Sequence, residues 1–314
     1  MKIFTLAPKE NWVCDRFSEE WEINNSDIST KNILDSNIVW LLAGWCWNHI
    51  PVKLLREKIV VLTIHHIVPE KFTESKRKEF LFRDQFVDLY HVTCERSVKQ
   101  VQEMTDKPVF KQPFWANQEL WFEMKDKEEL RKKYGLSEKY VIGSFQRDTE
   151  GHDLKSPKLE KGPDIFCDLV ENIAISNPNT HVLLSGWRRQ YVINRLESSN
   201  IPYLYLEMPG FDVINELYNC LDLYISSARY EGGPQSIVEC ALTRTPIVST
   251  DVGIASTILS KKSIFDETWY ATPDVETASK NVEHLKIPLG FSCFRDMFFD
   301  IFESQKIAIH TTGM

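Results

Sequence analysis

Short runs of β-branched and other apolar residues alternate along the chain with longer segments whose apolar positions recur at helical spacing. Strands separated by helix-length segments are typical of β-α-β units, in which the strands form a parallel sheet. In the first half, the pattern predicts a helix at Glu95–Met104 and strands at Lys2–Ala7, Asn37–Ala43, Lys58–Ile64, Val87–Thr93 and Val109–Gln112. In the second half, it predicts strands at Tyr140–Phe145, His181–Ser185, Tyr203–Leu206, Leu221–Ser226 and Pro246–Thr250, and helices at Asp164–Ile175, Arg188–Ser198, Asp212–Cys220 and Pro234–Thr243.

Two such sets of elements in 314 residues predict an α/β protein with two Rossmann-like, doubly wound parallel-sheet domains. The charged segment Lys125–Glu138 predicts a polar helix, and we expect the boundary between the two domains there. We therefore expect an N-terminal domain at residues 1–137 and a C-terminal domain at residues 138–290. Residues 291–314 contain an apolar helical stripe at Phe291–Glu303, which predicts a C-terminal helix.

Glycine and tryptophan are distributed in opposite ways. Eleven of the 12 glycines lie at or after Gly135, whereas seven of the nine tryptophans lie before it. Glycine lets the backbone approach a phosphate closely, so the second half is the better equipped for a nucleotide. Indole faces stack on apolar surfaces, including those of sugar rings, but tryptophans are also highly buried on average. A structural role in the core of the first domain is the favoured interpretation of these tryptophans.

Charge and cysteine content narrow the class of protein. Residues 1–137 hold 21 basic and 21 acidic side chains, so the net charge of −8 comes entirely from the remainder. This acidic balance disfavours sequence-independent nucleic-acid binding, which depends on neutralising phosphates. The seven cysteines are odd in number and form no C-x-x-C, which fits reduced thiols in the cytoplasm and predicts no metal site. The longest apolar run, Ile38–Trp47, is too short to span a bilayer.

The segment from Leu221 to Ala255 carries the strongest functional signal. A buried strand is followed by the loop Ser227–Gly233, and Pro234 then suits the first position of a helix. In an open parallel sheet, ligands bind beyond the carboxyl ends of the strands, next to helix N-termini. The free backbone N–H groups there favour an anion such as a diphosphate. A carboxylate in that loop, Glu231, fits contact with the hydroxyls of an attached sugar, or with a positively charged sugar transition state. The alternative is a helix-capping glutamate.

Here the sequence resembles the retaining glycosyltransferases of the GT-B fold, and within them the large glycosyltransferase family 4. EGGPQSIVE (Glu231–Glu239) is similar to the family's E-x7-E motif, and TPIVSTDVG to the strand and turn that follow it. Further similar stretches follow in the family's order: KIVVLTIH, FKQPFWANQELW, VIGSFQRDTEG with KLEKGPDIF, and HVLLSGW. The resemblance covers about residues 58–260 and implies two domains that face a cleft. It also implies that the C-terminal helix at residues 291–314 crosses back onto the N-terminal domain.

The resemblance implies roles residue by residue. Arg147 and Lys161, with Lys155 as the alternative lysine, would hold the donor diphosphate, and Glu231 the transferred sugar. Glu239 would contact the ribose, and the backbone near Met208–Gly210 the base. His65, with His66 as the alternative, would lie near the acceptor. Catalytic residues are thus His65, Arg147, Lys161 and Glu231, and the further donor-binding residues are Gly143, Lys155, Met208, Pro209, Gly232, Gly233, Pro234, Gln235, Ser236 and Glu239.

The implied activity is transfer of a sugar from a nucleotide sugar, UDP- or GDP-linked, with retention of configuration. No D-x-D triplet occurs, so the resemblance implies a metal-independent enzyme without a further cofactor. A nucleotide-sugar 2-epimerase or another GT-B chemistry, a non-catalytic scaffold and, less favoured, a nucleic-acid base glycosyltransferase remain alternatives.

The acceptor side departs from the family, because LAPKENWVCDRF lacks the glycine-rich loop expected after the first strand. Lys9, Asn11, Trp12 and Arg16 are therefore acceptor candidates by position only, and the acceptor is an unspecified glycan, small molecule or lipid-linked sugar. Lys71–Arg83 mixes basic and apolar residues with three acids. A solvated helix face is favoured there over peripheral contact with a membrane.

Overall fold

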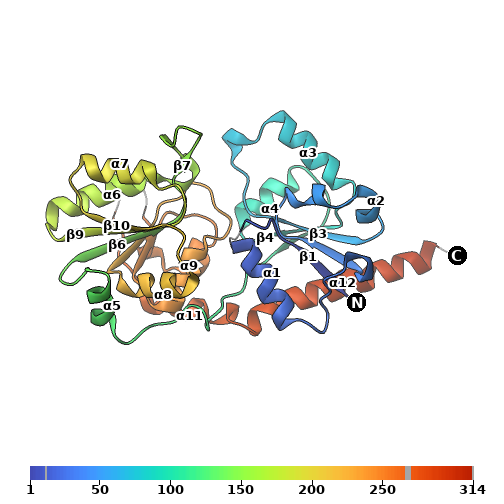
Figure 1. Cartoon of the computed structure of the whole chain (residues 1–314). Coiled ribbons are helices and arrows are strands. Elements are labelled where there is room, and N and C mark those ends of the chain that lie inside the picture. Colours follow the sequence, from blue (N-terminus) through green and yellow to red (C-terminus); the bar gives the residue numbers. More distant parts are fainter. Residues whose placement is uncertain (11–12, 266–269, 313–314) are drawn as a thin grey trace. The chain divides into compact units, whose positions relative to one another are not determined.

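The computed structural model describes residues 1–10, 13–265 and 270–312, with side chains up to residue 305 (Figure 1). The chain forms two compact units. The first unit comprises Met1–Trp115 and Pro288–Met314, and the second unit comprises Ala116–Ile287. Each is built on a five-stranded, all-parallel sheet, which confirms the predicted fold class.

The sheet of the first unit has its five named strands in chain order, and each lies within a run that the hydrophobic pattern predicts. These strands are β1 (Ile3–Leu6), β2 (Ile38–Leu41), β3 (Ile59–Ile64), β4 (Leu89–Val92) and β5 (Val109–Lys111). After β1, helix α1 (Val13–Asn24) leads to Ser29, which pairs with the outer edge of β1. The chain then returns to β2 on the other side of β1, so this sheet is wound in both directions.

Different sets of helices cover the two faces of this sheet. Helices α2 (Val52–Leu55), α3 (Glu74–Asp84) and α4 (Glu95–Gln102) pack on one face over an aliphatic core. Helices α1 and α12 (Leu289–Thr312) cover the other face with aromatic rings. Phe294 and Phe298 of α12 lie 5.4 and 5.2 Å from the ring of Trp40, which is fully buried. The apolar stripe of the last helix is therefore part of the core of the first unit.

The sheet of the second unit has the order β10-β9-β6-β11-β12. Its strands are β6 (Tyr140–Phe145), β9 (Thr180–Ser185), β10 (Tyr203–Leu206), β11 (Leu223–Ser226) and β12 (Ile247–Ser249). From β6 the chain moves outward through β9 to β10, and then crosses to the other side for β11 and β12. The point at which the winding reverses is therefore between β6 and β11, where α/β proteins bind their ligands.

Helices cover both faces of this second sheet (Figure 1). One face carries α6 (Pro163–Ser176) and α7 (Gln190–Ser198). The other carries α5 (Lys127–Lys133), α8 (Phe211–Cys220), α9 (Gln235–Thr243), α10 (Ala255–Ile258) and α11 (Val275–Asn281). A short antiparallel hairpin, β7 (Thr149–Glu150) and β8 (Ser156–Pro157), follows β6. Single turns of 3-10 helix lie at Ile33–Asp35, Cys46–His49, Pro69–Lys71, Leu159–Lys161, Lys261–Ser263 and Glu283–Leu285.

The division into units differs from the expected boundary between residues 137 and 138. Residues 116–137 belong to the second unit because they are built into its core and backbone bonding. The N–H of Ala116 donates to the carbonyl of Leu285 at 2.7 Å, and the N–H of Ile287 donates to that of Ala116 at 3.1 Å. Leu130 of α5 is buried in the second core. The polar helix that suggested a linker therefore has one apolar face and is part of the second unit.

Candidate functional site

The residues of the E-x7-E motif lie where the winding of the second sheet reverses. Glu231, Gly232 and Gly233 are in the loop that follows β11, and α9 begins at Gln235 directly after Pro234. The first turn of α9 lies at this carboxyl edge, and the N-terminus of a helix favours a negatively charged ligand. Among the donor-binding candidates, Gly232, Gly233, Pro234, Gln235 and Ser236 make up this loop-to-helix junction.

Lys161 reaches the same edge from a turn that is locked against the β11 loop. Its carbonyl accepts hydrogen bonds from Gln146 Nε2 at 3.0 Å and from Ser227 Oγ at 3.3 Å. The next residue, Gly162, has a left-handed φ of 61°, and a Cβ there would overlap the carbonyl oxygen of Ser227. Only glycine allows this approach, which explains the Lys-Gly pair in the sequence.

The Lys161 ammonium pairs directly with Glu231, whose Oε1 accepts its hydrogen bond. The two side chains are only 17% and 15% exposed. Burial, reinforced by the positive charges of Lys158 and Arg147, lowers the pKa of Lys161 to about 7, against the opposing carboxylate of Glu160. An anionic ligand would favour the charged ammonium and raise this pKa again. The structure therefore brings together two of the four predicted catalytic residues.

Further bonds tie the lysine turn to the loop that carries Glu231. The N–H groups of Arg229 and Tyr230 donate to the carbonyl of Glu160 at 2.9 and 3.1 Å. The guanidinium of Arg229 also binds both carboxylate oxygens of Asp164, at 2.7 and 2.6 Å. Bidentate pairs of this kind fix geometry as well as contribute energy. The lysine and the glutamate are thus held in one framework.

The turn after β12 packs against the loop that carries Glu231. Thr250 Oγ1 donates to the carbonyl of Ala228 at 2.5 Å. Gly253 has a φ of 57°, and a Cβ there would overlap the carbonyl of Gly232 and lie 2.9 Å from that of Glu231. The TDVG sequence is therefore a packing surface for the two-glycine loop.

Arg147 lies in the loop after β6, beside the same point of reversal. Its Nε donates to the carbonyl of Thr149 at 3.0 Å, and its guanidinium lies 5.1 Å from the ring centre of Trp187. It is close enough to Lys161 to lower the pKa of that lysine. The connection between β6 and α6 therefore contributes both cations of the candidate site, and the loop after β11 contributes the carboxylate of Glu231.

Glu239 occupies a different position from Glu231. It lies in α9, and Tyr218 of α8 donates its hydroxyl to Glu239 Oε2 at 2.7 Å. Tyr218 is buried, and burial together with the Glu239 charge holds its pKa well above the usual range. The tyrosine therefore stays a hydrogen-bond donor and fixes one oxygen of this carboxylate.

The remaining donor candidates lie in three different places. Gly143 is inside β6, where it makes room for the side chain of Leu221, so its position explains packing and not ligand contact. Lys155 is exposed in the connection between β7 and β8, away from the locked turn of Lys161. Met208 and Pro209 lie in the loop between β10 and α8, and Met208 is 39% exposed with a left-handed φ of 47°.

The histidine candidates belong to the first unit and follow β3. His65 Nε2 bonds the carbonyl of Leu42 at 2.8 Å and lies 3.3 Å from the thiol of Cys14. Its ring is stacked at 6.0 Å on Phe114. These contacts give His65 a structural role as well as its proposed one. His66 is half-buried beside it.

The surroundings of one of the four acceptor candidates, Arg16, argue against the predicted role. Arg16 is only 6% exposed, pairs with Glu20 at 3.6 Å and lies 5.2 Å from the ring of Phe17, so the prediction of an acceptor contact is corrected to a buried role in α1. Lys9 is exposed, and its N–H donates to Asp15 at 2.8 Å. Asn11 and Trp12 lie outside the described residues.

The sequence analysis missed a buried ion pair beneath the Arg147 loop. Arg189 is fully buried, and its Nε donates to Asp148 Oδ2 at 2.5 Å. The two residues are 41 positions apart. The adjacent arginines that follow the SGW sequence were the one available signal. A buried ion pair without good hydrogen bonding is costly, so this pair fixes the loop geometry closely.

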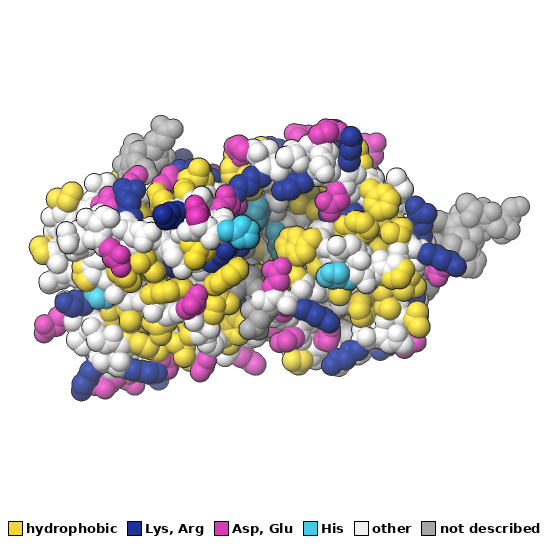
Figure 2. Space-filling view, turned by 45° about the horizontal axis from the view of Figure 1, so that its top comes forward, with side chains coloured by type: hydrophobic (Ala, Val, Ile, Leu, Met, Phe, Trp, Pro, Cys, Tyr) yellow, Lys and Arg dark blue, Asp and Glu magenta, His cyan; other side chains and the backbone are white. Residues whose placement is uncertain are grey.

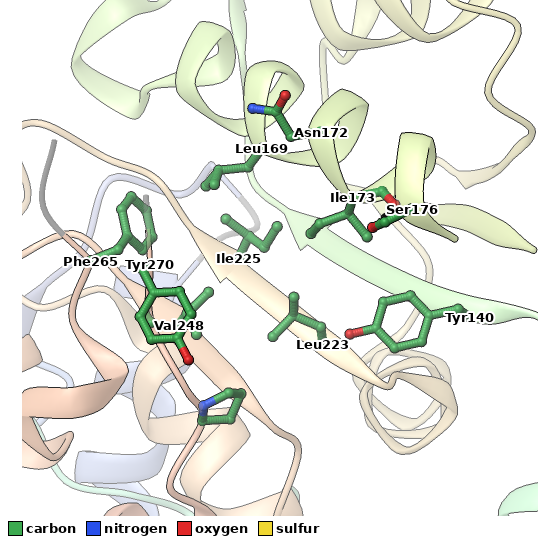
Figure 3. A pocket seen from close by; sticks show the side chains of 12 residues that line it. Tyr140, Leu169, Asn172, Ile173, Ser176, Leu223, Ile225, Val248, Phe265 and Tyr270 are labelled. Carbon is green, nitrogen blue, oxygen red and sulfur yellow. Dashed lines mark hydrogen bonds between the residues drawn. The ribbon is translucent and has the colours of Figure 1, made fainter. Parts of the chain in front are cut away.

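A hollow of about 350 Å³ lies elsewhere in the second unit, between α6, the sheet and the residues Phe265 and Tyr270 (Figure 3). Figure 3 shows Ile173 and Leu169 of α6 facing Leu223 and Ile225 of the sheet. The lining is largely apolar and includes the first residues of β6 and β11. It therefore opens at the opposite end of these strands from the candidate site.

Comparisons with known proteins identify the class. Residues 154–285 match the family model described as Glycosyl transferases group 1. Anabaena Alr3699/HepE, solved with UDP and glucose, superposes with a TM-score of 0.68 at 14% identity over 100% of both chains. Sucrose-phosphate synthase from Thermosynechococcus elongatus gives a TM-score of 0.63 at 13% identity, over 96% of this chain and 81% of that one. The chain has the GT-B fold of the glycosyltransferases.

A curated relative covers part of the chain. The lipopolysaccharide core biosynthesis mannosyltransferase LpsB of Rhizobium meliloti (strain 1021) is 25% identical over 143 residues, 43% of this chain and 38% of the relative. The match thus spans well under half of that protein. In the described part of the chain, no helix is long and apolar enough to cross a membrane. Among the same residues, no group of three or more histidine, cysteine or acidic side chains is placed to hold a metal ion.

Proposed function

We propose that this protein is a retaining, metal-independent glycosyltransferase that moves a sugar from a nucleotide-sugar donor to a glycan, small-molecule or lipid-linked acceptor. The observation that carries the proposal is the buried pair of Lys161 and Glu231 at the start of α9, where the winding of the sheet reverses. A cation and a carboxylate at one anion-binding helix end suit a ligand with a phosphate part and a hydroxyl-rich part.

The diphosphate of the donor would bind at the first turn of α9, with Lys161 and Arg147 as its cations. Negative charge builds on the diphosphate as the bond to the sugar breaks. Preorganised cations and N–H groups in a water-poor site stabilise such charge, with a typical value of roughly 3–4 kcal/mol for one well-placed group. The side chain of Lys161 is held ready for this role by the locking of its turn against Ser227.

Donor binding would also free Glu231. In the structure this carboxylate is bound to Lys161. A diphosphate that takes over the ammonium leaves Glu231 able to accept hydrogen bonds from the sugar hydroxyls or to face the positive charge that develops on the sugar. Diphosphate and sugar would therefore be recognised as a pair, and a nucleoside monophosphate would bind more weakly.

The nucleoside would lie along α9 and the β10–α8 loop. Glu239, fixed by Tyr218, is proposed to accept the ribose hydroxyls, and the backbone around Met208 and Pro209 to face the base. UDP sugars are the first donors to test, because the Anabaena protein is solved with UDP and glucose. GDP sugars are the second.

His65 of the first unit is proposed to act near the acceptor. Its Nε2 is already bonded to Leu42, so any contact with substrate would be made by the opposite side of the ring. A nucleic-acid acceptor is disfavoured because Figure 2 shows acidic and basic side chains interspersed over the visible face. Sequence-independent binding of nucleic acid depends on clustered basic groups.

A donor screen tests this proposal. The full chain is titrated with UDP, GDP, ADP and dTDP sugars in the presence of EDTA, and slow donor hydrolysis is followed. We expect one donor to bind and to be hydrolysed, and Glu231→Ala and Arg147→Ala to abolish turnover. Arg244→Ala is the matched control, because Arg244 pairs with Glu276 on the surface. Absence of binding by every donor, or a strict need for a divalent metal, would overturn the proposal. Retention is tested separately, by the anomeric configuration of the product.

A further inference from the structure

The turn Gly186–Arg189, which follows β9, has a backbone that short-range preferences do not favour. Gly186 has a φ of 97°, and Arg188 adopts a left-handed φ of 58° although it is not glycine. Strained conformations of this kind persist only where surrounding bonds enforce them, and they cluster at functional sites. Here the Arg188 carbonyl accepts hydrogen bonds from the N–H groups of Asp148 and Thr149, at 3.3 and 3.1 Å. The hydroxyl of Tyr205 also donates to the Gly186 carbonyl at 2.9 Å.

Arg189 joins this turn to the loop that carries Arg147. Its guanidinium donates to Asp148 Oδ2 at 2.5 Å, to the Ser185 carbonyl at 2.7 Å and to the Ser144 carbonyl. Every one of these partners lies at the carboxyl end of β6 or β9. The two loops are therefore held together by these bonds, and they fix the backbone from which the side chains of Trp187 and Arg188 extend.

Two guanidinium groups lie over one indole ring on this support. The Cζ atoms of Arg147 and Arg188 are 5.1 and 4.8 Å from the ring centre of Trp187, whose side chain is half exposed. Cation–π attraction at these distances orients a guanidinium without neutralising its charge. The half-exposed indole of Trp187 is therefore placed to orient two guanidinium groups, and it is not a core residue.

The charges of this pair have no carboxylate partner in the described part of the second unit. The five other arginines of that unit each pair with an acidic side chain: Arg131, Arg189, Arg195, Arg229 and Arg244. Two like charges that both lie about 5 Å from one ring repel each other, and an anion bound close to both would offset that repulsion. Charged guanidinium groups also match phosphate oxygens well.

We propose that Trp187 is a positioning residue that holds Arg147 and Arg188 as a paired guanidinium contact for the diphosphate of the donor. This inference rests on the proposed function, because it takes the donor diphosphate as the ligand of Arg147. It adds Arg188 as a second binding residue. It also assigns the exposed indole to orientation of these cations, and not to contact with the base or the sugar.

A double-mutant cycle tests the positioning role. The probe is the nucleoside diphosphate, among UDP, GDP, ADP and dTDP, that binds the wild type in the donor screen. We expect Trp187→Leu to raise its Kd about tenfold in the wild type, or about 1.4 kcal/mol. In the Arg147→Ala, Arg188→Gln background the same change should have an effect below twofold. An equal loss in both backgrounds would overturn the proposal, because it would mean that the indole contacts the ligand directly.

Conservative replacement and the second cation complete the test. Trp187→Phe keeps an aromatic face and should recover most of the affinity, which a merely structural role at an exposed position would not require. Arg188→Gln should raise the Kd several-fold; an unchanged Kd in that variant would overturn the paired contact. Failure of the proposed function looks different, since the wild type itself would then bind none of the four diphosphates. Thermal unfolding midpoints within 2 °C of wild type are the folding criterion for each variant.

Discussion

A buried ionisable nitrogen in each unit, that of His91 in the first and that of Lys161 in the second, allows a comparison of their surroundings. In the first unit, His91 of β4 is bonded by Thr63 Oγ1 at Nδ1 and by the Gln112 carbonyl at Nε2, and burial lowers its pKa to about 3. In the second unit, Lys161 keeps a pKa of about 7 and a carboxylate partner in a loop. His91 is therefore permanently neutral and satisfied within the core, whereas Lys161 can change both its charge and its partner near neutral pH.

The difference between His91 and Lys161 indicates which of two similar sheets carries groups that can change charge on binding a ligand. The first unit uses its polar side chains to complete a core that is dominated by aromatic rings: Trp21, Trp40, Trp115, Phe114 and Phe294. The second unit uses glycines to bring three loops within contact of one another at the point where the winding reverses. The two sheets thus differ: the first is completed by an aromatic core, and the second brings together the loops of the proposed donor site.

The largest effect is expected at the partner of Lys161. Glu231→Gln keeps the shape of the side chain but removes its charge, so donor turnover should fall by about 10²–10³-fold, as for loss of one preorganised electrostatic contact. Binding of the nucleoside diphosphate should change by less than about fivefold, because that ligand lacks the transferred sugar that Glu231 is proposed to contact. Initial-rate kinetics and calorimetric titration measure the two quantities. A turnover within threefold of wild type would show that this carboxylate has no part in the reaction.

The first unit should respond in stability and not in donor binding. Phe294→Ala removes a buried ring that packs on Trp40 and Trp115, and should lower the free energy of unfolding by about 3–5 kcal/mol. Denaturant titration measures this loss. Donor affinity measured well below the unfolding midpoint should be unchanged. A comparable loss of affinity in the folded variant would contradict the separation of roles.

A matched pair of glycines isolates the close approach of the loops. Gly162 and Gly135 both have a left-handed φ, but a Cβ on Gly135 meets nothing within 4 Å, whereas one on Gly162 meets the Ser227 carbonyl. Gly135→Ala should lower the free energy of unfolding by about 1–2 kcal/mol, through backbone strain alone. Gly162→Ala should cost more and also weaken donor binding at least tenfold. Chemical denaturation and donor titration of both variants check this, and equal behaviour of the two would remove the locking role of Ser227.

The smallest expected effect is a pH dependence of donor affinity. Because the free Lys161 has a pKa of about 7, at higher pH the donor must bind together with a proton. The Kd should therefore rise about tenfold from pH 7.0 to 8.5, for a nucleotide sugar whose diphosphate does not titrate in that range. Lys161→Arg should flatten the profile, since arginine keeps its charge. A wild-type Kd that falls or stays level over this range would contradict the assignment.

Much of the fold could be predicted because its signals are local. Every strand of the two five-stranded sheets lies inside, or within one residue of, a predicted run, since apolar β-branched segments bounded by polar residues leave a clear pattern. The loop of Glu231 was also predictable, because a strand, two glycines and a proline before a helix define an anion-binding junction. Lys161 was distinguished from Lys155 by the glycine that follows it.

The remainder depends on contacts between distant residues. The pairing of Ser29 with β1 involves one residue, so it has no period to detect. Arg189 and Asp148 are linked only through the packing of two loops. Arg16 was an acceptor candidate only because of its position after the first strand, yet its side chain is buried against Glu20 and Phe17. The unit boundary was misplaced because α5 has a polar sequence and a single buried leucine, Leu130.

The return of α12 to the first unit also determines the order in which the protein can fold during synthesis. Residues 116–287 leave the ribosome as a continuous stretch and can complete their own core at once. The aromatic face around Trp40 must wait until Phe291, Phe294 and Phe298 have been translated. Domains usually fold as units during synthesis, and exposed apolar surface favours aggregation in the meantime. In the nascent chain the second unit can therefore be folded while the first unit is still incomplete, and chaperones are expected to bind the first unit.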